Sequence, residues 1–288
     1  MIDETPLLFG PARSQVGVLN APSVNAPEMA VIFINAGLIH HVGPNRLHVS
    51  LARALRRLGV ASLRLDLSGV GDSPPRADHL SIYELIRREP REAMDALAER
   101  GFTRFVLVGL CSGAYSAFHV ACDDPRVVAA VMINPEDLAR VDGTESPDQS
   151  AAWARRYWTH SLLRPRAWRN LLSGRVNYRR LLETLARQFK SPAEGDTTAG
   201  RGGLQARMLQ AVRTRSLKLL FLSSGDDVSC EYLDLILDQD VLAQSPPGAL
   251  QRHAIKDCDH LFTRLEDQRR LIAWLVPWMV DLGRVTIR

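Results

Sequence analysis

The sequence of 288 residues contains few cysteines and no long hydrophobic run. No eighteen consecutive residues are apolar, so no membrane span is predicted. Its four cysteines (Cys111, Cys122, Cys230 and Cys258) form no CxxC pair, which argues against a zinc site or a disulfide framework. The N-terminus is acidic and interrupted by Pro6, unlike a secretory signal. We therefore expect a reduced, cytoplasmic protein with neither metal nor cofactor, in which a free thiol could act.

Negative charge is scarce in one part of the chain. Residues 151–215 contain thirteen arginines and one lysine against three acidic residues, although the net charge of the whole chain is only +4. A basic segment on an acidic body indicates a local role for these arginines and argues against general nucleic-acid binding. They would suit an anionic carrier, such as the phosphates of coenzyme A or an acyl-carrier protein.

Short apolar runs alternate with helical patterns along most of the chain. Buried strands are predicted at 31–34, 61–66, 105–108, 127–133, 217–222 and near 251–255, after an edge hairpin around 14–19. Helices are predicted at about 47–58, 80–100 and 114–121, and in a closing segment from 265. This alternation predicts an α/β fold with a mostly parallel central sheet flanked by helices.

Residues 136–205 interrupt this alternation. They contain three tryptophans, many arginines and no strand-like run. The stretch 191–203 is rich in glycine, threonine and serine, which predicts a flexible linker. We therefore predict a core formed by residues 1–135 and 206–288, with residues 136–205 inserted as a helical cap.

The pentapeptide 109–113, Gly-Leu-Cys-Ser-Gly, has the spacing of a nucleophile elbow with Cys111 at its centre. A nucleophile on a tight strand-to-helix turn has a strained backbone, so the residues two positions away on each side must lack a bulky Cβ group. Ser112 is the alternative nucleophile, but a shifted register would place Leu110 at a flanking position. An inert core cysteine is the other alternative for Cys111.

Two further polar segments complete a possible triad. Ser223–Asp227 follows a predicted strand, and Asp257–His260 precedes the last helix, so the chain order is nucleophile, acid, histidine. Cys111 would attack a carbonyl carbon, His260 would transfer the proton, and an aspartate would orient the imidazole. The distance from the strand favours Asp227 over Asp226 without separating them. A histidine satisfied in the core is the alternative for His260.

These motifs resemble those of the α/β-hydrolase superfamily over nearly the whole chain. The pattern Asp66-x-x-Gly69-x-Gly71-x-Ser73 is similar to the loop after the fourth strand of that superfamily. Three segments resemble most closely the hydrolases associated with bacterial exosortase systems: 64–73, 224–228 and 259–263. The sub-branch does not identify a substrate.

The resemblance also implies an oxyanion hole. One donor would be the backbone N–H of Ser112, and the other would be that of Leu38, with Gly37 as the alternative. The sequence departs here from the usual His-Gly of the superfamily. Gly37, His40 and His41 could line the pocket, although two adjacent histidines on an extended chain cannot face the same way, so at most one of them would be functional.

The sequence thus predicts an enzyme with a Cys111–Asp227–His260 triad that acts on a small acyl substrate through a covalent acyl-enzyme. A thiolate exchanges with a thioester at little net free-energy change, which favours acyl transfer or hydrolysis on a thioester or activated ester. A lactone or ester hydrolase is the alternative, since dienelactone hydrolases of the superfamily also employ cysteine. A non-catalytic binding scaffold is the third hypothesis.

Overall fold

The computed structural model of the chain describes residues 4–22, 28–78, 80–140, 146, 149, 194–225 and 227–284. Its strands are β1 (Glu4–Phe9), β2 (Gln15–Asn20), β3 (Met29–Ile34), β4 (Ala61–Leu65), β5 (Arg104–Leu110), β6 (Val127–Ile133), β7 (Lys218–Ser224) and β8 (Leu250–Ile255). Its helices are α1 (Leu47–Arg57), α2 (Ile82–Ala98), α3 (Ser112–Asp123), α7 (Glu194–Thr214), α8 (Ser229–Ile236), α9 (Gln239–Gln244) and α10 (Leu265–Arg284), with short 3-10 turns at Pro11–Arg13 and Pro44–Arg46.

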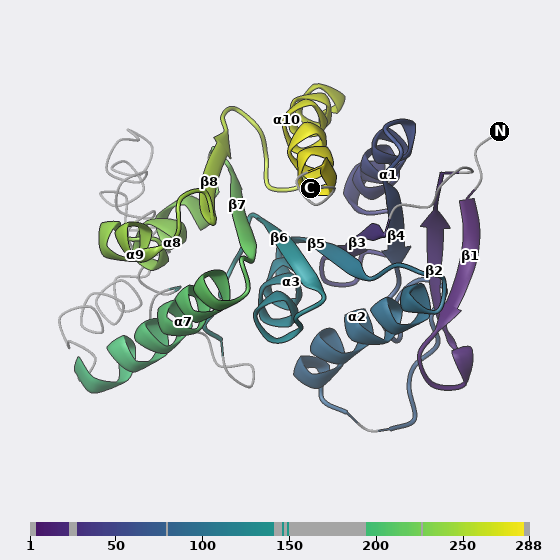
Figure 1. The fold of residues 1–288 in the computed structure, drawn as a ribbon, viewed down its shortest axis with the longest axis horizontal. Helices are drawn as coiled ribbons and strands as arrows, with labels where there is room; N and C mark the ends of the chain where they lie inside the picture. The colour runs from purple at the N-terminus through teal and green to yellow at the C-terminus, as the bar shows by residue number, and fades with distance from the viewer. Residues whose placement is uncertain are drawn as a thin grey trace, which may run out of the picture.

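These strands form one sheet in the order β1-β2-β4-β3-β5-β6-β7-β8 (Figure 1). The edge hairpin of β1 and β2 is antiparallel and pairs antiparallel with β4, whereas all the following pairs are parallel. Parallel neighbours need crossover connections, and helices supply them here. The predicted α/β fold with a mostly parallel sheet is confirmed.

Helices cover both faces of the sheet, with α1 and α10 on one face and α2, α3 and α7 on the other (Figure 1). Strand β3 shows how the sequence serves both faces, because all six of its residues are buried. Ala30, Ile32 and Ile34 belong to the core under α2, α3 and α7, whereas Val31 and Phe33 belong to the core under α1 and α10. The continuous apolar run of this strand follows from its double burial.

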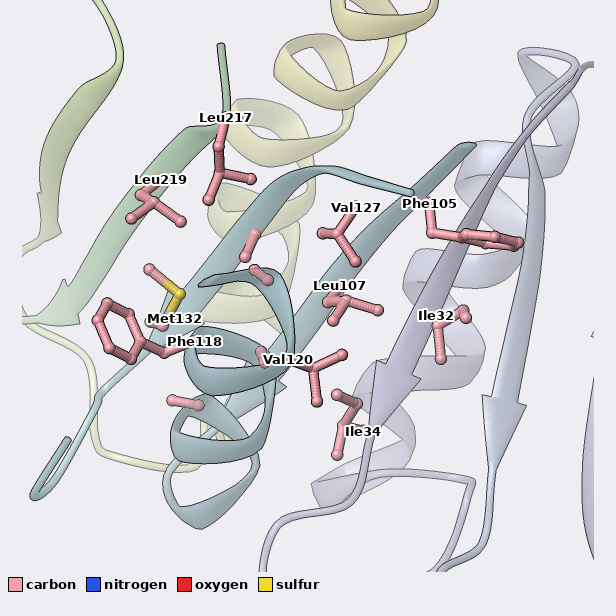
Figure 2. Close-up of a cluster of buried hydrophobic side chains, with 14 of the residues drawn as sticks. Ile32, Ile34, Phe105, Leu107, Phe118, Val120, Val127, Met132, Leu217 and Leu219 are labelled. Atoms are coloured by element: carbon pink, nitrogen blue, oxygen red, sulfur yellow. The ribbon is translucent and has the colours of Figure 1, made fainter. Parts of the chain in front are cut away.

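Helix α3 packs into the larger of these two cores (Figure 2). Phe118 and Val120 point from this helix toward the side chains of the strands beneath it, among them Leu107 and Met132. All four side chains are fully buried. This packing fixes the start of α3 against the end of β5, where the elbow lies.

The prediction of a flexible linker at 191–203 is wrong for residues 194–203, because these residues belong to α7. Three glycines near the middle of this helix disfavour it, since each costs about 1 kcal/mol relative to alanine. The later turns offset this cost by packing on the core through the buried side chains of Leu204, Met208 and Val212. Tertiary burial here outweighs local propensity.

The predicted boundary between cap and core, at residues 205 and 206, lies inside α7. Most of the predicted cap (141–145, 147–148 and 150–193) lies outside the described residues. In the part of the chain that is described, no helix is long and apolar enough to cross a membrane.

We expect Leu107→Ala to lower the free energy of unfolding by about 2–5 kcal/mol, because it opens a cavity in a close-packed core. Leu107 in β5 is fully buried, whereas Leu58 is 56% exposed and serves as a matched control. Leu58→Ala should change stability by less than about 0.5 kcal/mol. Urea denaturation of both variants measures this difference, and equal losses would contradict the position of the core.

Candidate active site

The elbow between β5 and α3 depends on two glycines. Cys111 has φ 57° and ψ −120°, a backbone conformation that residues other than glycine rarely adopt. A Cβ atom on Gly109 would lie 2.0 Å from the carbonyl oxygen of Gly113, and one on Gly113 would lie 2.5 Å from the carbonyl oxygen of Asn35. Close backbone contacts therefore require glycine at positions 109 and 113, as the spacing predicted, and the strained residue between them is Cys111. Ser112, the alternative nucleophile, is the first residue of α3.

Asp227 and His260 meet although 33 residues separate them in the chain. The distance between Nδ1 of His260 and Oδ2 of Asp227 is 2.6 Å. The other carboxylate oxygen of Asp227 accepts a hydrogen bond from the backbone N–H of Ser229 at 2.9 Å. Burial by itself would raise the pKa of Asp227, but the hydrogen bonds from His260 and Ser229 outweigh it and lower the pKa. Asp226, the alternative acid, lies outside the described residues.

Cys111 lies beside His260 and beside a carboxylate that sequence reasoning missed. Its Sγ donates a hydrogen bond to Oε1 of Glu136 at 3.3 Å. The Sγ atom, a carboxylate oxygen of Glu136 and a ring nitrogen of His260 all lie within 4.8 Å of one another. The hydrogen bond to Asp227 and then that to Cys111 raise the pKa of His260 to about 10. A thiol, a base with its orienting acid and a second carboxylate thus converge.

Asn134 holds these segments together at the end of β6. Its Nδ2 donates to the backbone carbonyl of His260 at 2.8 Å, and its Oδ1 accepts from the N–H of Ser224 at 2.6 Å. Asn134 has φ 45°, in the left-handed region that asparagine tolerates better than most residues. The only sequence signal for Asn134 and Glu136 is that polar residues follow a buried strand.

The loop after β3 brings the predicted oxyanion donors close to Cys111. The N–H of Gly37 donates to Oγ of Ser112 at 2.7 Å, so this donor is already engaged. No described residue accepts from the N–H of Leu38, whose side chain is 89% exposed. As the first residue of α3, Ser112 has a backbone N–H without an intrahelical acceptor. Of the alternatives, Leu38 and Ser112 are the free donors.

His41 and His40 occupy different environments. Nδ1 of His41 lies 2.8 Å from Oδ2 of buried Asp66, and the backbone N–H of His41 donates to the other oxygen of that carboxylate. His40 is exposed and meets His41 only edge to face, with ring centroids 5.3 Å apart. His41 therefore anchors the loop after β3 to the loop after β4.

An apolar cavity of about 310 Å³ opens beside Cys111. Gly37 and Leu38 line it near the thiol, as do Cys111, Ser112 and Glu136, whereas His40 and His41 are not among its described lining residues. Its farther wall comes from the loop after β4 and from α2 and α3, through Leu67, Val70, Ile82, Tyr83, Ile86 and Tyr115. The volume is at the small end of the range for ligand pockets, about 300–1,000 Å³.

Comparison with known proteins shows the family of the chain. The sequence matches the alpha/beta hydrolase family over residues 31–274. The chain belongs to this family. No curated protein matches the sequence.

Solved structures similar to this alpha/beta hydrolase include a peptidase, an esterase and a dienelactone hydrolase. Proline iminopeptidase from Mycobacterium smegmatis is 14% identical with a TM-score of 0.60, and the match covers 99% of this chain and 100% of that one. An esterase from Pyrococcus furiosus is 11% identical with a TM-score of 0.60 (96% and 90% covered). Dienelactone hydrolase from Anabaena variabilis is 14% identical with a TM-score of 0.56 (96% and 98% covered). At these identities the likeness shows the fold alone.

The stability of this alpha/beta hydrolase should depend on pH through His260. Its pKa is about 10 in the folded protein against an ordinary 6.5, so the folded state binds the proton more tightly. This contribution is complete below about pH 6.5 and is lost as pH rises to about 10, by at most about 1.4 kcal/mol per pH unit. We expect the stability of the wild type relative to His260→Gln to fall across this window.

Urea denaturation of both proteins at several pH values measures this effect. Asp227→Asn should flatten the same dependence, because it removes the hydrogen bond that contributes most to the raised pKa of His260. A difference between wild type and His260→Gln that stays constant with pH would contradict the coupling.

Proposed function

We propose that the protein is an enzyme that transfers or hydrolyses an acyl group through a covalent intermediate on Cys111. The observation that carries the proposal is the 2.6 Å contact between Asp227 and His260, with Sγ of Cys111 close to the same ring. The strained elbow conformation of Cys111 and the free backbone N–H groups of Leu38 and Ser112 add support. Membership of the alpha/beta hydrolase family supports a hydrolytic enzyme.

The reaction has two steps with His260 as the proton carrier. The proton of Cys111 passes to His260, and the thiolate adds to the carbonyl carbon of the substrate. The N–H groups of Leu38 and Ser112 stabilise the oxyanion, and His260 then protonates the leaving group as the acyl–Cys111 thioester forms. In the second step His260 takes a proton from water or another acceptor, which attacks the carbonyl carbon of this thioester. The C–S bond breaks, the acyl product leaves, and the proton passes from His260 to Sγ of Cys111. Asp227 stabilises the positive charge of the imidazole in both steps.

We infer that the substrate is a thioester or an activated ester. Exchange of one thioester for another changes little free energy, whereas attack on an unactivated amide is harder. The apolar cavity beside Cys111 suits a small acyl group. A reduced compartment such as the cytoplasm would keep the thiol of Cys111 free.

The proposed carrier, coenzyme A or an acyl-carrier protein, rests on the basic segment of the sequence. Three arginines of this segment, two in α7 and one directly after it, already have partners within the protein. Arg207 pairs with Asp123, while Arg213 and Arg215 donate to backbone carbonyl oxygens. The other basic residues of the segment, apart from Arg201, lie at 155–190, outside the described residues.

A lactone or ester hydrolase is the alternative, and a dienelactone hydrolase is among the proteins that share this fold. Product analysis with and without an added alcohol or amine acceptor separates transfer from hydrolysis. The sub-branch associated with exosortase systems stays a prediction.

Intact-mass spectrometry after incubation with a mixture of acyl-thioesters should show one acyl group per protein, mapped to the peptide that holds Cys111. Cys111→Ala should abolish the adduct, because it removes the thiol that lies on the strained turn between β5 and α3. Cys122→Ser is the matched control and should keep it, since the thiol of Cys122 is largely buried, which raises its pKa to about 12.

Two outcomes would reject this assignment. One is a one-to-one adduct that persists in Cys111→Ala. The other is the absence of both adduct and turnover across esters, lactones and thioesters, which would favour the binding scaffold.

A further inference from the structure

Cys111, Glu136 and His260 come from three different loops, and their polar atoms gather at one point. The Sγ of Cys111 lies 3.3 Å from Oε1 of Glu136, and both atoms lie within 4.8 Å of a ring nitrogen of His260. We propose that these three side chains form a binding site for zinc or a similar divalent transition metal, which competes with the acyl substrate for the thiol. The metal site itself rests on this geometry, whereas its competition with an acyl substrate rests on the proposed function.

The separations suit a tetrahedral metal centre. Zinc binds a thiolate at about 2.3 Å and nitrogen or oxygen ligands at about 2.0–2.2 Å, so neighbouring ligand atoms of a tetrahedron lie about 3.5 Å apart. The pair of Cys111 and Glu136 is already at 3.3 Å. The ring nitrogen of His260 is at most 4.8 Å from each, so small side-chain rotations bring all three into place.

His260 is oriented for this role by Asp227. The carboxylate occupies Nδ1, so Nε2 is the nitrogen available on the side of the thiol. A metal-binding histidine almost always donates its other ring N–H to a carboxylate, a carbonyl or water, which fixes the ring and strengthens it as a ligand. The backbone of His260 is also held by Asn134.

The ligand types select the metal. One thiolate, one imidazole and one carboxylate suit zinc and its neighbours better than magnesium or calcium, which prefer oxygen ligands. Three protein ligands leave a fourth position open toward the cavity, where water would complete the tetrahedron.

A second group of possible metal ligands lies in the loops after β3 and β4. His41, Asp66 and Asp72 also lie within 4.8 Å of one another. Both carboxylate oxygens of Asp66 are engaged, one with the backbone N–H of His41 and the other with Nδ1 of His41 and the N–H of Asp72. This group ties two loops together and carries no proposal, whereas Cys111 and Glu136 line the cavity.

Calorimetric titration of the metal-free full-length protein with zinc tests the proposal, and cobalt(II) absorption reports whether a thiolate binds the metal. We expect one zinc ion per protein and a thiolate-to-cobalt charge-transfer band. Cys111→Ala should lose the band, and Glu136→Gln should weaken zinc binding at least about tenfold. Asp227→Asn should weaken zinc binding by about 10–100-fold, because it acts through His260.

Cys122→Ser is the matched control and should bind zinc as the wild type does. Thermal melting of each variant shows that it is folded. Zinc binding that is absent from the wild type, or unchanged in Cys111→Ala, would overturn the site, and unchanged affinity in Glu136→Gln would remove Glu136 from it. An acyl-enzyme that forms in a protein without zinc affinity would overturn this inference and leave the proposed function standing. Zinc binding in a protein that forms no acyl-enzyme would overturn the proposed function and leave the metal site standing.

Discussion

The close backbone contact at the elbow is the constraint on which the candidate site depends. A side chain on Gly113 would collide with the carbonyl of Asn35, and one on Gly109 would collide with the carbonyl of Gly113. The start of α3 is therefore pressed against both the end of β5 and the loop after β3. This approach allows Ser112 to accept from Gly37, and it sets the donors of the loop beside Cys111.

Hydrogen bonds from the main chain then place the remaining groups. Asn134 links the ends of β6 and β7 to the loop that carries His260, and Ser229 holds Asp227 from the start of α8. These bonds tie the loop that carries His260 and the start of α8 to the ends of β6 and β7. Asp66 does the same for the loop after β3 through His41. Such preorganisation lowers the cost of ordering the site when a substrate binds.

Glu136 adds a carboxylate to what would otherwise be a thiol and imidazole pair. A carboxylate and a thiolate repel each other, whereas a protonated His260 attracts both. The same three groups can carry protons during acyl transfer or can surround one metal ion. The proposed acylation and the proposed metal binding would therefore draw on the same atoms and exclude each other.

The strands and the elbow could be predicted from sequence because their causes are local. Doubly buried strands need continuous apolar runs, and a strained turn needs glycine at two fixed positions. The chain order of Cys111, Asp227 and His260 could be predicted as well, because it is visible in the sequence. Helix α7 was not, since its glycines favoured a loop and only its packing on the core shows why it forms.

By itself, the sequence determined the α/β fold, the elbow and the identity of its strained residue. The tertiary structure decided the contacts between residues far apart in the chain. It engaged the N–H of Gly37 but gave that of Leu38 no acceptor among the described residues, directed His41 to Asp66, and placed Glu136 beside Cys111. These contacts depend on the register of parallel strands and on the course of three loops, and neither leaves a periodic signal in the sequence.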